Sequence, residues 1–290
     1  MLPRQLSNHV WRLGHDYFQS YLIRGSCACA LVETGIPATA DLLLEQLSLI
    51  GARPGFLIVT HPHSDHVTGL DRLKKAFPLA AVIAGKGAES FLRHPRAADV
   101  MAREDRYMAG FMASQGVFSG GTQGEVPFLL SGCRVANDGD EMDLGGLKIR
   151  FLEAKGHSPG NILVHVPDDK TLLASDSLGN LYPGRGFFPT FFTGYSDYQA
   201  TIDSLAALDP GIVGLAHNGL FTGGGEIRRI FRDARKAAQD LKTYAMNDAR
   251  DDEAIARDLF HFYYCDELTM CSRENIFQCC RILVRRIREL

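Results

Sequence analysis

Residues 56–66 read FLIVTHPHSDH, an apolar run that leads into a loop rich in metal-binding side chains. The apolar half, Phe56 to Thr60, has the length and composition of a buried strand, and a helix is predicted directly after the loop, from Val67 to Phe77. The ligand-type residues of the loop are His61, His63, Asp65 and His66. Three of the chain's 10 histidines fall in this loop, which makes a plain solvent-exposed loop a weak alternative. Imidazole and carboxylate groups bind zinc, iron and manganese, so the stretch predicts a metal site at a strand end.

Three further ligand-type residues stand where a predicted strand gives way to a loop. His157 follows the strand predicted at 147–153, Asp176 follows the one at 171–174, and His217 follows the one at 212–216. Loops at strand ends are where sheet proteins gather site residues from distant parts of the sequence. One such residue alone is an ordinary polar strand terminus. Because four strand ends carry ligand-type residues, we expect them to share one site.

The first 225 residues alternate short apolar runs with a few helical stretches. Further strands are predicted at 21–23, 27–33, 81–84 and 162–166, and further helices at 39–50 and 197–208. Ser196 and Gln199 have the spacing of a capping box, which predicts that the last of these helices begins after Ser196. Residues 88–118 are predicted to form a helical insertion between two predicted strands. The whole pattern is typical of an α/β fold with many short strands.

The composition changes abruptly at Glu226. All 29 glycines and all 12 prolines precede this residue. Glycine and proline interrupt helices, so their absence, with apolar residues three and four positions apart, predicts long helices. We therefore divide the chain into a domain at 1–225 and an appended helical segment at 226–290.

Composition and charge exclude several classes of protein. The 290 residues are 46% hydrophobic and carry a net charge of −3, so a full core is expected and a basic surface for nucleic acid is not. No apolar run approaches the roughly 20 residues that span a bilayer. Seven cysteines without a Cys-x-x-Cys pair, and a start at Met1 without signal-peptide features, favour a reduced, cytoplasmic setting.

The order of the ligand-type residues resembles that of the metallo-β-lactamase-fold superfamily of metallohydrolases. The superfamily's His-x-His-x-Asp-His motif matches residues 61–66, its Gly-His matches Gly156 and His157, and its later ligands match Asp176 and His217. Glu33 stands where an aspartate is commoner in the superfamily. The resemblance covers roughly residues 10–225 and implies a four-layer αββα sandwich with the metal site at one edge of the paired sheets.

The resemblance also implies a role for each ligand. One divalent metal ion would be held by His61, His63 and His157, and a second by Asp65, His66 and His217, with Asp176 bridging the two. Zinc is the first choice of metal, with iron and manganese open. A hydroxide shared by the two ions would attack the substrate, and Asp65 would act as the catalytic residue that orients it. The turn Ala216-His217-Asn218-Gly219 departs from the usual Gly-His-Gly.

Aromatic residues crowd the stretch after Asp176. The candidates for substrate binding are Arg185, Phe187, Phe188, Phe191, Phe192 and Tyr195. Such rings suit an apolar acyl pocket, with Arg185 available for an anionic group. The alternative is that the rings only seal the core against the C-terminal helices.

In layout the chain is similar to thioesterase-type members such as the 2-aminobenzoylacetyl-CoA thioesterases, whose C-terminal helices cover the active site. The predicted function is hydrolysis of a small-molecule acyl substrate, a thioester or an ester or lactone, with no nucleic-acid or membrane partner. Two alternatives stay open: a persulfide dioxygenase with one iron on His61, His157 and Asp176, and a non-catalytic metal-containing signalling or binding protein. The amphipathic tail can pack on its own domain or on a second copy, so a homodimer is also open.

Overall fold

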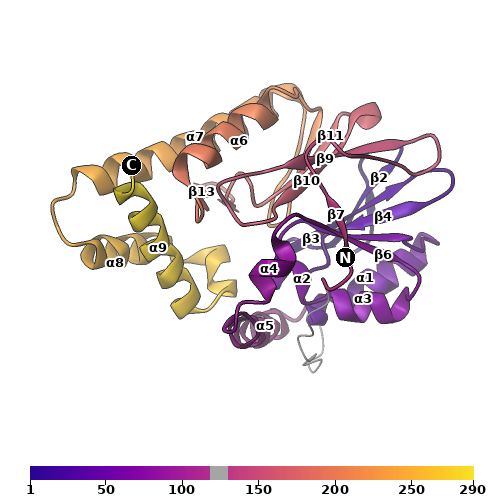
Figure 1. Ribbon diagram of the computed structural model, residues 1–290, viewed down its shortest axis with the longest axis horizontal. Helices are drawn as coiled ribbons and strands as arrows, with labels where there is room; N and C mark the ends of the chain where they lie inside the picture. The colour runs from indigo at the N-terminus through magenta and orange to yellow at the C-terminus, as the bar shows by residue number, and fades with distance from the viewer. Residues whose placement is uncertain (118–129) are drawn as a thin grey trace.

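Two β-sheets lie face to face between layers of helices in the computed structural model, which describes residues 1–117 and 130–290 (Figure 1). The first sheet has the strand order β1 (Arg4–Gln5), β2 (Val10–His15), β3 (Phe18–Arg24), β4 (Cys29–Val32), β5 (Phe56–Val59), β6 (Ala81–Gly85) and β7 (Arg134–Ala136). The second has the order β15 (Leu220–Thr222), β14 (Ile212–Leu215), β11 (Thr171–Ser175), β10 (Ile162–Val166), β9 (Lys148–Glu153) and β8 (Glu141–Asp143). A separate hairpin joins β12 (Asn180–Tyr182) to β13 (Gly186–Phe188).

Helices cover the outer faces of both sheets. The first part of the chain has α1 (Pro37–Leu49), α2 (Ser64–Val67), α3 (Leu70–Ala76), α4 (Ala88–Leu92) and α5 (Ala97–Ser114). The second part has α6 (Tyr195–Ala206), α7 (Gly224–Asn247), α8 (Asp252–Tyr263) and α9 (Arg273–Arg288), with short 3₁₀ turns η1 (Pro167–Asp169) and η2 (Asp266–Met270). Among the described helices, none combines the length and apolar character needed to cross a bilayer.

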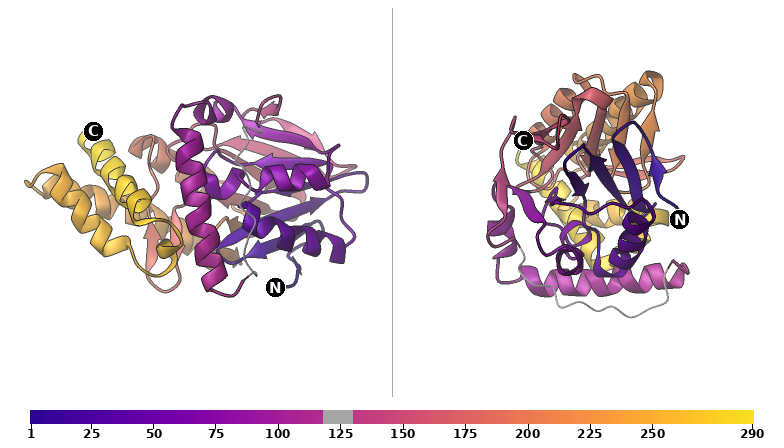
Figure 2. Two further views of the ribbon diagram at one scale, coloured as in Figure 1. Left: turned by 90° about the horizontal axis from the view of Figure 1, so that it is seen from below. Right: turned by 90° about the vertical axis from the view of Figure 1, so that its right-hand side faces the viewer.

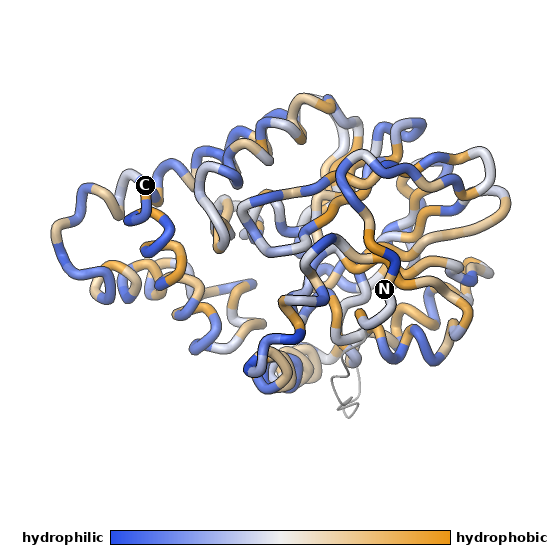
Figure 3. Tube along the Cα trace, in the orientation of Figure 1, coloured by the Kyte–Doolittle hydropathy of each residue, from blue (hydrophilic) through white to orange (hydrophobic). Residues whose placement is uncertain are grey.

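The alternation of side chains along each strand builds the layers. In β5, Leu57 and Val59 pack with Leu43 of α1, whereas Ile58 points the other way and packs with Val164 of the second sheet. In β10, Leu163 points away from Val164, into the cluster beneath α6 and α7. Figure 3 shows the hydrophobic stretches running along these strands. The four-layer αββα sandwich predicted from the sequence is therefore confirmed.

Two helix predictions were wrong in detail. The helix predicted at 67–77 is split into α2 and α3 at Gly69, where a Cβ atom would come within 2.2 Å of the Thr34 carbonyl oxygen. The helix predicted to begin after Ser196 begins at Tyr195 instead, after Gly194, and no side chain caps it. Gln199 does not complete a capping box, because its Nε2 donates to the Arg235 carbonyl on α7. Tertiary contacts decide both boundaries.

The predicted insertion and tail are helical and contact each other. The insertion contains α4 and α5, and its predicted last residue, 118, lies outside the described residues. Ser272 caps α9, and both its backbone N–H and its hydroxyl donate to the buried Glu104 carboxylate of α5. The turn η2, which joins α8 to α9, packs against α5, and the left view of Figure 2 shows α5 between the α8–α9 pair and the sheets. Helix α9 is therefore hydrogen-bonded to α5, which belongs to the same domain as the predicted ligands His61 to His66.

Candidate metal centre and substrate site

Strand ends of both sheets deliver the ligand-type side chains to one edge of the sandwich. His61 follows β5, His157 follows β9, Asp176 directly follows β11, and His217 lies two residues beyond β14. Because α2 already begins at Ser64, Asp65 and His66 lie on a helical turn that leads away from His63. The structure brings all seven predicted ligands together, in two adjacent groups.

The first group, which we call the three-histidine set, contains His61, His63 and His157. The Nε2 atom of His61 lies 3.0 Å from Nδ1 of His63 and 3.1 Å from Nε2 of His157. All three nitrogen atoms therefore point to one place.

The second group, the acid-containing set, consists of Asp65, His66, Asp176 and His217. The Nε2 atom of His66 lies 3.5 Å from Oδ2 of Asp65 and 3.3 Å from Oδ2 of Asp176, and Nε2 of His217 lies 3.3 Å from Oδ2 of Asp65. Oδ2 of Asp176 is also 3.9 Å from Nε2 of His61 and 3.8 Å from Nε2 of His157. Asp176 is thus placed between the two sets.

Both sets fit a divalent metal ion. Around a tetrahedral zinc with bonds of about 2.1 Å, ligand atoms are about 3.4 Å apart. Four nitrogen–oxygen pairs of the acid-containing set are 3.3 to 3.6 Å apart, and in each set all the ligand atoms lie within 4.8 Å of one another. Among the described residues, Nε2 of His66 and Nε2 of His217 are buried and have no hydrogen-bond partner. Buried imidazole nitrogen atoms without a partner are costly, and a metal ion would satisfy them.

The imidazoles of the three-histidine set have lowered pKa values and are therefore neutral at neutral pH. Burial lowers the pKa of His61, His63 and His157. Neighbouring imidazoles lower the pKa of His61 and of His63 further, and the pKa of His63 falls to about 3. Neutral imidazole is the form that binds metal. These three side chains need to lose no proton at neutral pH before a metal ion binds.

The acid-containing set is charged. Burial alone would raise the carboxyl pKa values of Asp65 and Asp176, but the imidazoles of His66 and His217 hold both below their usual range. In turn, burial alone would lower the pKa of His66, whereas the carboxylates of Glu33, Asp65 and Asp176 raise it above its usual value. The pKa of His217 is raised by Asp176 and Asp65 against the effect of burial. Without metal, opposite charges hold this set together.

A buried carboxylate, Glu33, supports the acid-containing set from behind. Its Oε2 lies 2.9 Å from Nδ1 of His66, and its Oε1 accepts hydrogen bonds from the hydroxyls of Thr60 and Ser175. Thr60 also contacts Nδ1 of His61, at 3.1 Å. Partners of this kind fix the orientation of an imidazole and raise its basicity. Glu33 therefore links ligands of both sets, although the sequence marked it only as a departure from the usual aspartate.

Three residues beside the ligands have backbone angles that favour glycine. Glu33, Ser175 and Asn218 adopt φ values of 69°, 46° and 53°. Each such conformation costs about 1–3 kcal/mol in a residue with a side chain and persists only where its surroundings impose it. Ser175 precedes Asp176, and Asn218 follows His217, so the strain lies where the chain turns to present a ligand.

Two further predicted ligands, His157 and His217, are oriented by backbone carbonyls. Nδ1 of His157 donates to the Thr190 carbonyl at 3.0 Å, and Nδ1 of His217 donates to the Tyr17 carbonyl. The residue before His157 must be glycine, since Gly156 has a φ of 97° and a Cβ atom there would lie 2.4 Å from the backbone of Tyr198. Neither carbonyl partner could be identified from the sequence, because any residue supplies a carbonyl.

The centre opens to solvent on the side of His63 and Asp65. His63 is half-buried and the Asp65 side chain is 16% exposed, whereas the side chains of His61, His66 and Asp176 are at most 6% exposed. Aromatic rings flank this side. The Phe192 ring lies 5.5 Å from that of His157 and 6.3 Å from that of His63, and the Phe91 ring lies 6.1 Å from that of His63.

The other aromatic candidates lie in different places. Phe188 packs against Tyr263, and Phe191 packs against Tyr195 and Tyr198, all within the core beneath α6 and α7. Tyr195 also lies under the ammonium group of Lys242. Phe188, Phe191 and Tyr195 thus contact the tail helices and α6, in line with the sealing alternative. Of the six candidates, Phe192 lies nearest to the imidazoles of the predicted ligands His157 and His63.

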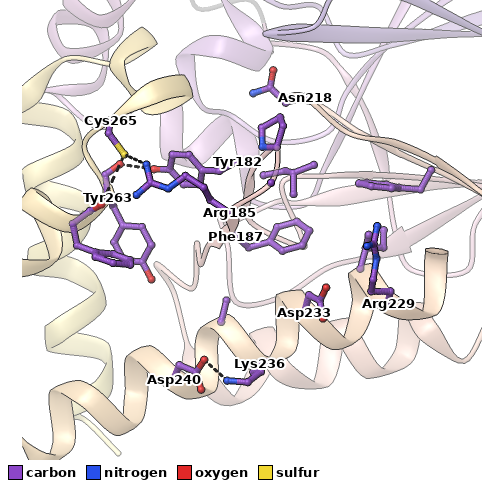
Figure 4. Close-up of a pocket in the computed structure, with 18 residues that line it drawn as sticks. Tyr182, Arg185, Phe187, Asn218, Arg229, Asp233, Lys236, Asp240, Tyr263 and Cys265 are labelled. Carbon is purple, nitrogen blue, oxygen red and sulfur yellow. Dashed lines mark hydrogen bonds and ion pairs between the residues drawn. The ribbon is translucent and has the colours of Figure 1, made fainter. Parts of the chain in front are cut away.

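Arg185 and Phe187 line a groove of about 780 Å³ between the β12–β13 hairpin, α7 and the end of α8. Arg185 donates to Asp266 at 2.6 Å and to the Cys265 sulfur at 2.8 Å, so its charge is already paired. Figure 4 shows Arg185 turned toward Cys265, with Asn218 on the side of the groove opposite the α7 residues. Asn218 adjoins the predicted ligand His217, so the groove reaches the neighbourhood of the candidate centre.

A sequence profile of the metallo-β-lactamase superfamily matches residues 17–217. The chain belongs to this superfamily. The matched range contains both ligand sets, the supporting Glu33 and most strands of the two sheets.

Curated relatives of the chain include two kinds of hydrolase. A hydroxyacylglutathione hydrolase from Acidiphilium cryptum is 26% identical over 209 residues, which cover 72% of this chain and 63% of that enzyme. The acyl-coenzyme A thioesterase MBLAC2 from Bos taurus is 28% identical over 253 residues, which cover 79% of this chain and 84% of the thioesterase. The chain spans 63% and 52% of the first two hydroxyacylglutathione hydrolases that it matches, less than two thirds of their length.

Solved structures support the fold. An archaeal metallo-β-lactamase superfamily protein from Sulfolobus tokodaii matches with a TM-score of 0.63 at 18% identity, covering 97% of this chain and 99% of that one. A metallo-β-lactamase family protein from Thermus thermophilus also has a TM-score of 0.63, at 17% identity, with coverage of 92% and 91%. At this identity the likeness concerns the fold.

Proposed function

We propose that this protein is a metal-dependent hydrolase that cleaves a small acyl thioester, using two divalent metal ions, with zinc as the first choice. The observation that carries the proposal is the placement of Asp176 between two complete ligand sets, with Oδ2 within 3.9 Å of imidazole nitrogen atoms from both. A carboxylate in this position suits a pair of ions that act together on one substrate.

Two bound metal ions would lower the pKa of a shared water molecule and polarise the carbonyl group of the substrate. The residues of the chain supply the rest of the chemistry. The three-histidine set offers neutral nitrogen ligands, and the acid-containing set brings the negative charge that balances the ions. Asp65 lies on the open side, where its carboxylate would accept a hydrogen bond from the attacking water and so orient it.

The surroundings of the centre favour a thioester over other acyl compounds. Apart from the imidazoles, the rings beside His63 and His157 belong to Phe91 and Phe192, which can contact an acyl group but donate no proton. A thiolate leaves without protonation, whereas an alkoxide or amine leaving group needs an acid. The names of two relatives, hydroxyacylglutathione hydrolase and acyl-coenzyme A thioesterase, both denote acyl groups carried on a thiol.

We also propose that the helical tail, residues 226–290, completes the substrate site of the domain at 1–225. The groove beside Asn218 is lined by α7 and the end of α8 as well as by the β12–β13 hairpin, and it would receive the thiol-bearing half of the substrate. Substrates with a truncated carrier, such as acyl pantetheine in place of acyl-CoA, should then show a higher KM with the same acyl group.

One panel of substrates tests the proposed function. Metal-loaded protein is assayed with acyl-CoA and acylglutathione thioesters, lactones, phosphodiesters and glutathione persulfide, with and without oxygen. Thiol release from a thioester, lost on chelation and restored by added metal, is the expected result. Oxygen consumption on the persulfide would move the protein to the dioxygenase class, and turnover of lactones alone would exclude the thioester. No turnover of any compound by metal-loaded protein would favour a binding role.

A further inference from the structure

Arg286, near the end of α9, contacts the catalytic domain rather than only its own helix. Its Nε donates a hydrogen bond of 2.9 Å to the backbone carbonyl of Phe192, and its Nη1 pairs with Glu289. Neighbouring arginines pair with acids inside the tail: Arg281 with Glu253, Arg285 with Glu289, and Arg288 with Asp252. Only 26% of the Arg286 side chain is exposed, against 63% for Arg285.

The carbonyl that Arg286 holds belongs to a segment that supports a predicted metal ligand. The N–H of Phe192 donates to the Thr190 carbonyl at 2.9 Å, and the same carbonyl accepts the hydrogen bond from Nδ1 of His157. The Thr190 hydroxyl donates to the backbone carbonyl of Asp176 at 3.0 Å. A continuous series of hydrogen bonds therefore runs from α9 through residues 190–192 to His157 and Asp176.

The same segment sets the position of the Phe192 ring. This ring is half-buried and faces His157 and His63 on the open side of the centre. The preceding residue, Phe191, is fully buried between Tyr195 and Tyr198, so the backbone is fixed on that side by packing. On the Phe192 side it is fixed by the guanidinium of Arg286.

We propose that Arg286 is a positioning residue: by holding the Phe192 carbonyl, it places the Phe192 ring as the wall that limits the acyl group and steadies the carbonyl that orients His157. This inference rests on the proposed function for the acyl group, but the effect on His157 does not. An arginine suits the role because its planar, permanently charged guanidinium keeps a fixed donor direction.

The test compares four variants of the full-length protein: Arg286→Ala, Arg286→Lys, Phe192→Ala and, as a matched control, Arg285→Ala. Kinetics are measured with thioesters of short, medium and long acyl chains. Arg286→Ala should raise the KM for the preferred chain length about tenfold, as expected from the loss of one hydrogen bond to a charged group, with a smaller change in kcat. It should also flatten the preference among chain lengths, as Phe192→Ala does. Arg286→Lys should recover part of the preference, and Arg285→Ala should match the wild type.

A second readout does not depend on turnover. The visible absorption spectrum of the cobalt(II)-loaded protein reports the ligand geometry around His157. Arg286→Ala should change this spectrum, Arg285→Ala should not, and circular dichroism should show that both variants are folded. If wild-type protein hydrolyses no thioester, the proposed function fails while the cobalt spectrum still tests the link from Arg286 to His157. If Arg286→Ala matches Arg285→Ala in the cobalt spectrum and in chain-length preference, the inference is overturned.

Discussion

The three-histidine set and the acid-containing set lie side by side at one edge of the sandwich but differ in charge. Burial keeps the histidines of the first set neutral, whereas Asp65 and Asp176 are charged and raise the pKa of His66 and His217 in the second. The groups that orient the histidines differ too, since one is neutral and the other is charged. His157 is held by a backbone carbonyl, and His66 by the carboxylate of Glu33.

Because of this difference in charge, the two candidate ion sites would bind a metal ion from different starting states. The three-histidine set is ready to bind a cation without losing a proton, but it supplies no negative charge of its own. The acid-containing set supplies that charge, and without metal its histidines take up protons that a metal ion must displace. Asp176, within reach of both, connects the two arrangements.

Replacing the shared carboxylate should have the largest effect, because it removes the feature that the two sets have in common. We expect Asp176→Asn to lower the metal content from two ions per chain to one or none. Thioesterase activity should fall about 10³-fold or more, since metal ions supply several kcal/mol of transition-state stabilisation. Metal analysis and kinetics check both effects, with the exposed Asp41→Asn as control. Two retained ions with near-normal activity would contradict the bridging role.

Removing one ligand from each set should separate them. His63→Ala should lose the ion of the three-histidine set, and Asp65→Ala the ion of the acid-containing set, so each variant should retain about one ion per chain. Competition with a chromophoric chelator then gives the affinity of the set that is left. Equal affinities in the two variants would show that the difference in charge has no consequence for binding.

Glu33→Gln keeps the size of the side chain but removes the charge that faces His66. We expect the affinity of the acid-containing set for metal to fall about 10- to 100-fold, as for other partners of ligand histidines, with little change at the three-histidine set. The chelator competition of the two single-ligand variants, repeated in the Glu33→Gln background, measures this. An equal loss at both sets would indicate that Glu33 acts on the whole fold through Thr60 and Ser175 instead.

The smallest expected effect is a difference in pH dependence. A raised pKa means that His66 and His217 keep their protons to a higher pH in the metal-free protein, so metal binding at this set releases protons and weakens as the pH falls. A lowered pKa means that the histidines of the three-histidine set lose their protons at a lower pH, so a metal ion binds there at neutral pH without proton release. Proton release, measured in weak buffer with a pH indicator during zinc titration of Asp65→Ala and His63→Ala, should be larger in His63→Ala. Equal proton release in the two variants would contradict the difference in pKa between the two sets.

The α/β class and the gathering of the ligand-type residues could be predicted from local patterns in the sequence, whereas the four-layer order was implied by the resemblance to the metallo-β-lactamase fold. Alternating apolar residues such as those of β5 define the faces of a strand, and a ligand-type residue at each strand end needs no knowledge of its partners. Glu33 was visible only as a departure from the usual aspartate, and its contacts with Thr60, His66 and Ser175 come from three other segments.

The substrate side depends on contacts between distant residues, and here the sequence was less informative. The sequence offered the same two alternatives, acyl pocket or core seal, for all the residues after Asp176. In the structure Phe188 packs on Tyr263 and Arg185 pairs with Asp266, both from the tail. No local pattern tells which of Phe191 and Phe192 faces the candidate centre. The two residues lie in an irregular segment, where the direction of each side chain does not follow a fixed period. The hydrogen bond from Arg286 to Phe192 likewise joins segments that only the fold brings together.

Metal reconstitution of the wild-type protein tests most directly the proposal that hydrolysis requires two metal ions. Metal-free protein is titrated with zinc, iron(II) or manganese(II), and bound metal and thioester hydrolysis are measured at each step. Hydrolysis that is absent without metal and reaches its maximum as the second ion binds is the predicted result. Metal-free protein that is as active as the loaded form, or maximal activity with a single ion and no binding of a second, would contradict it.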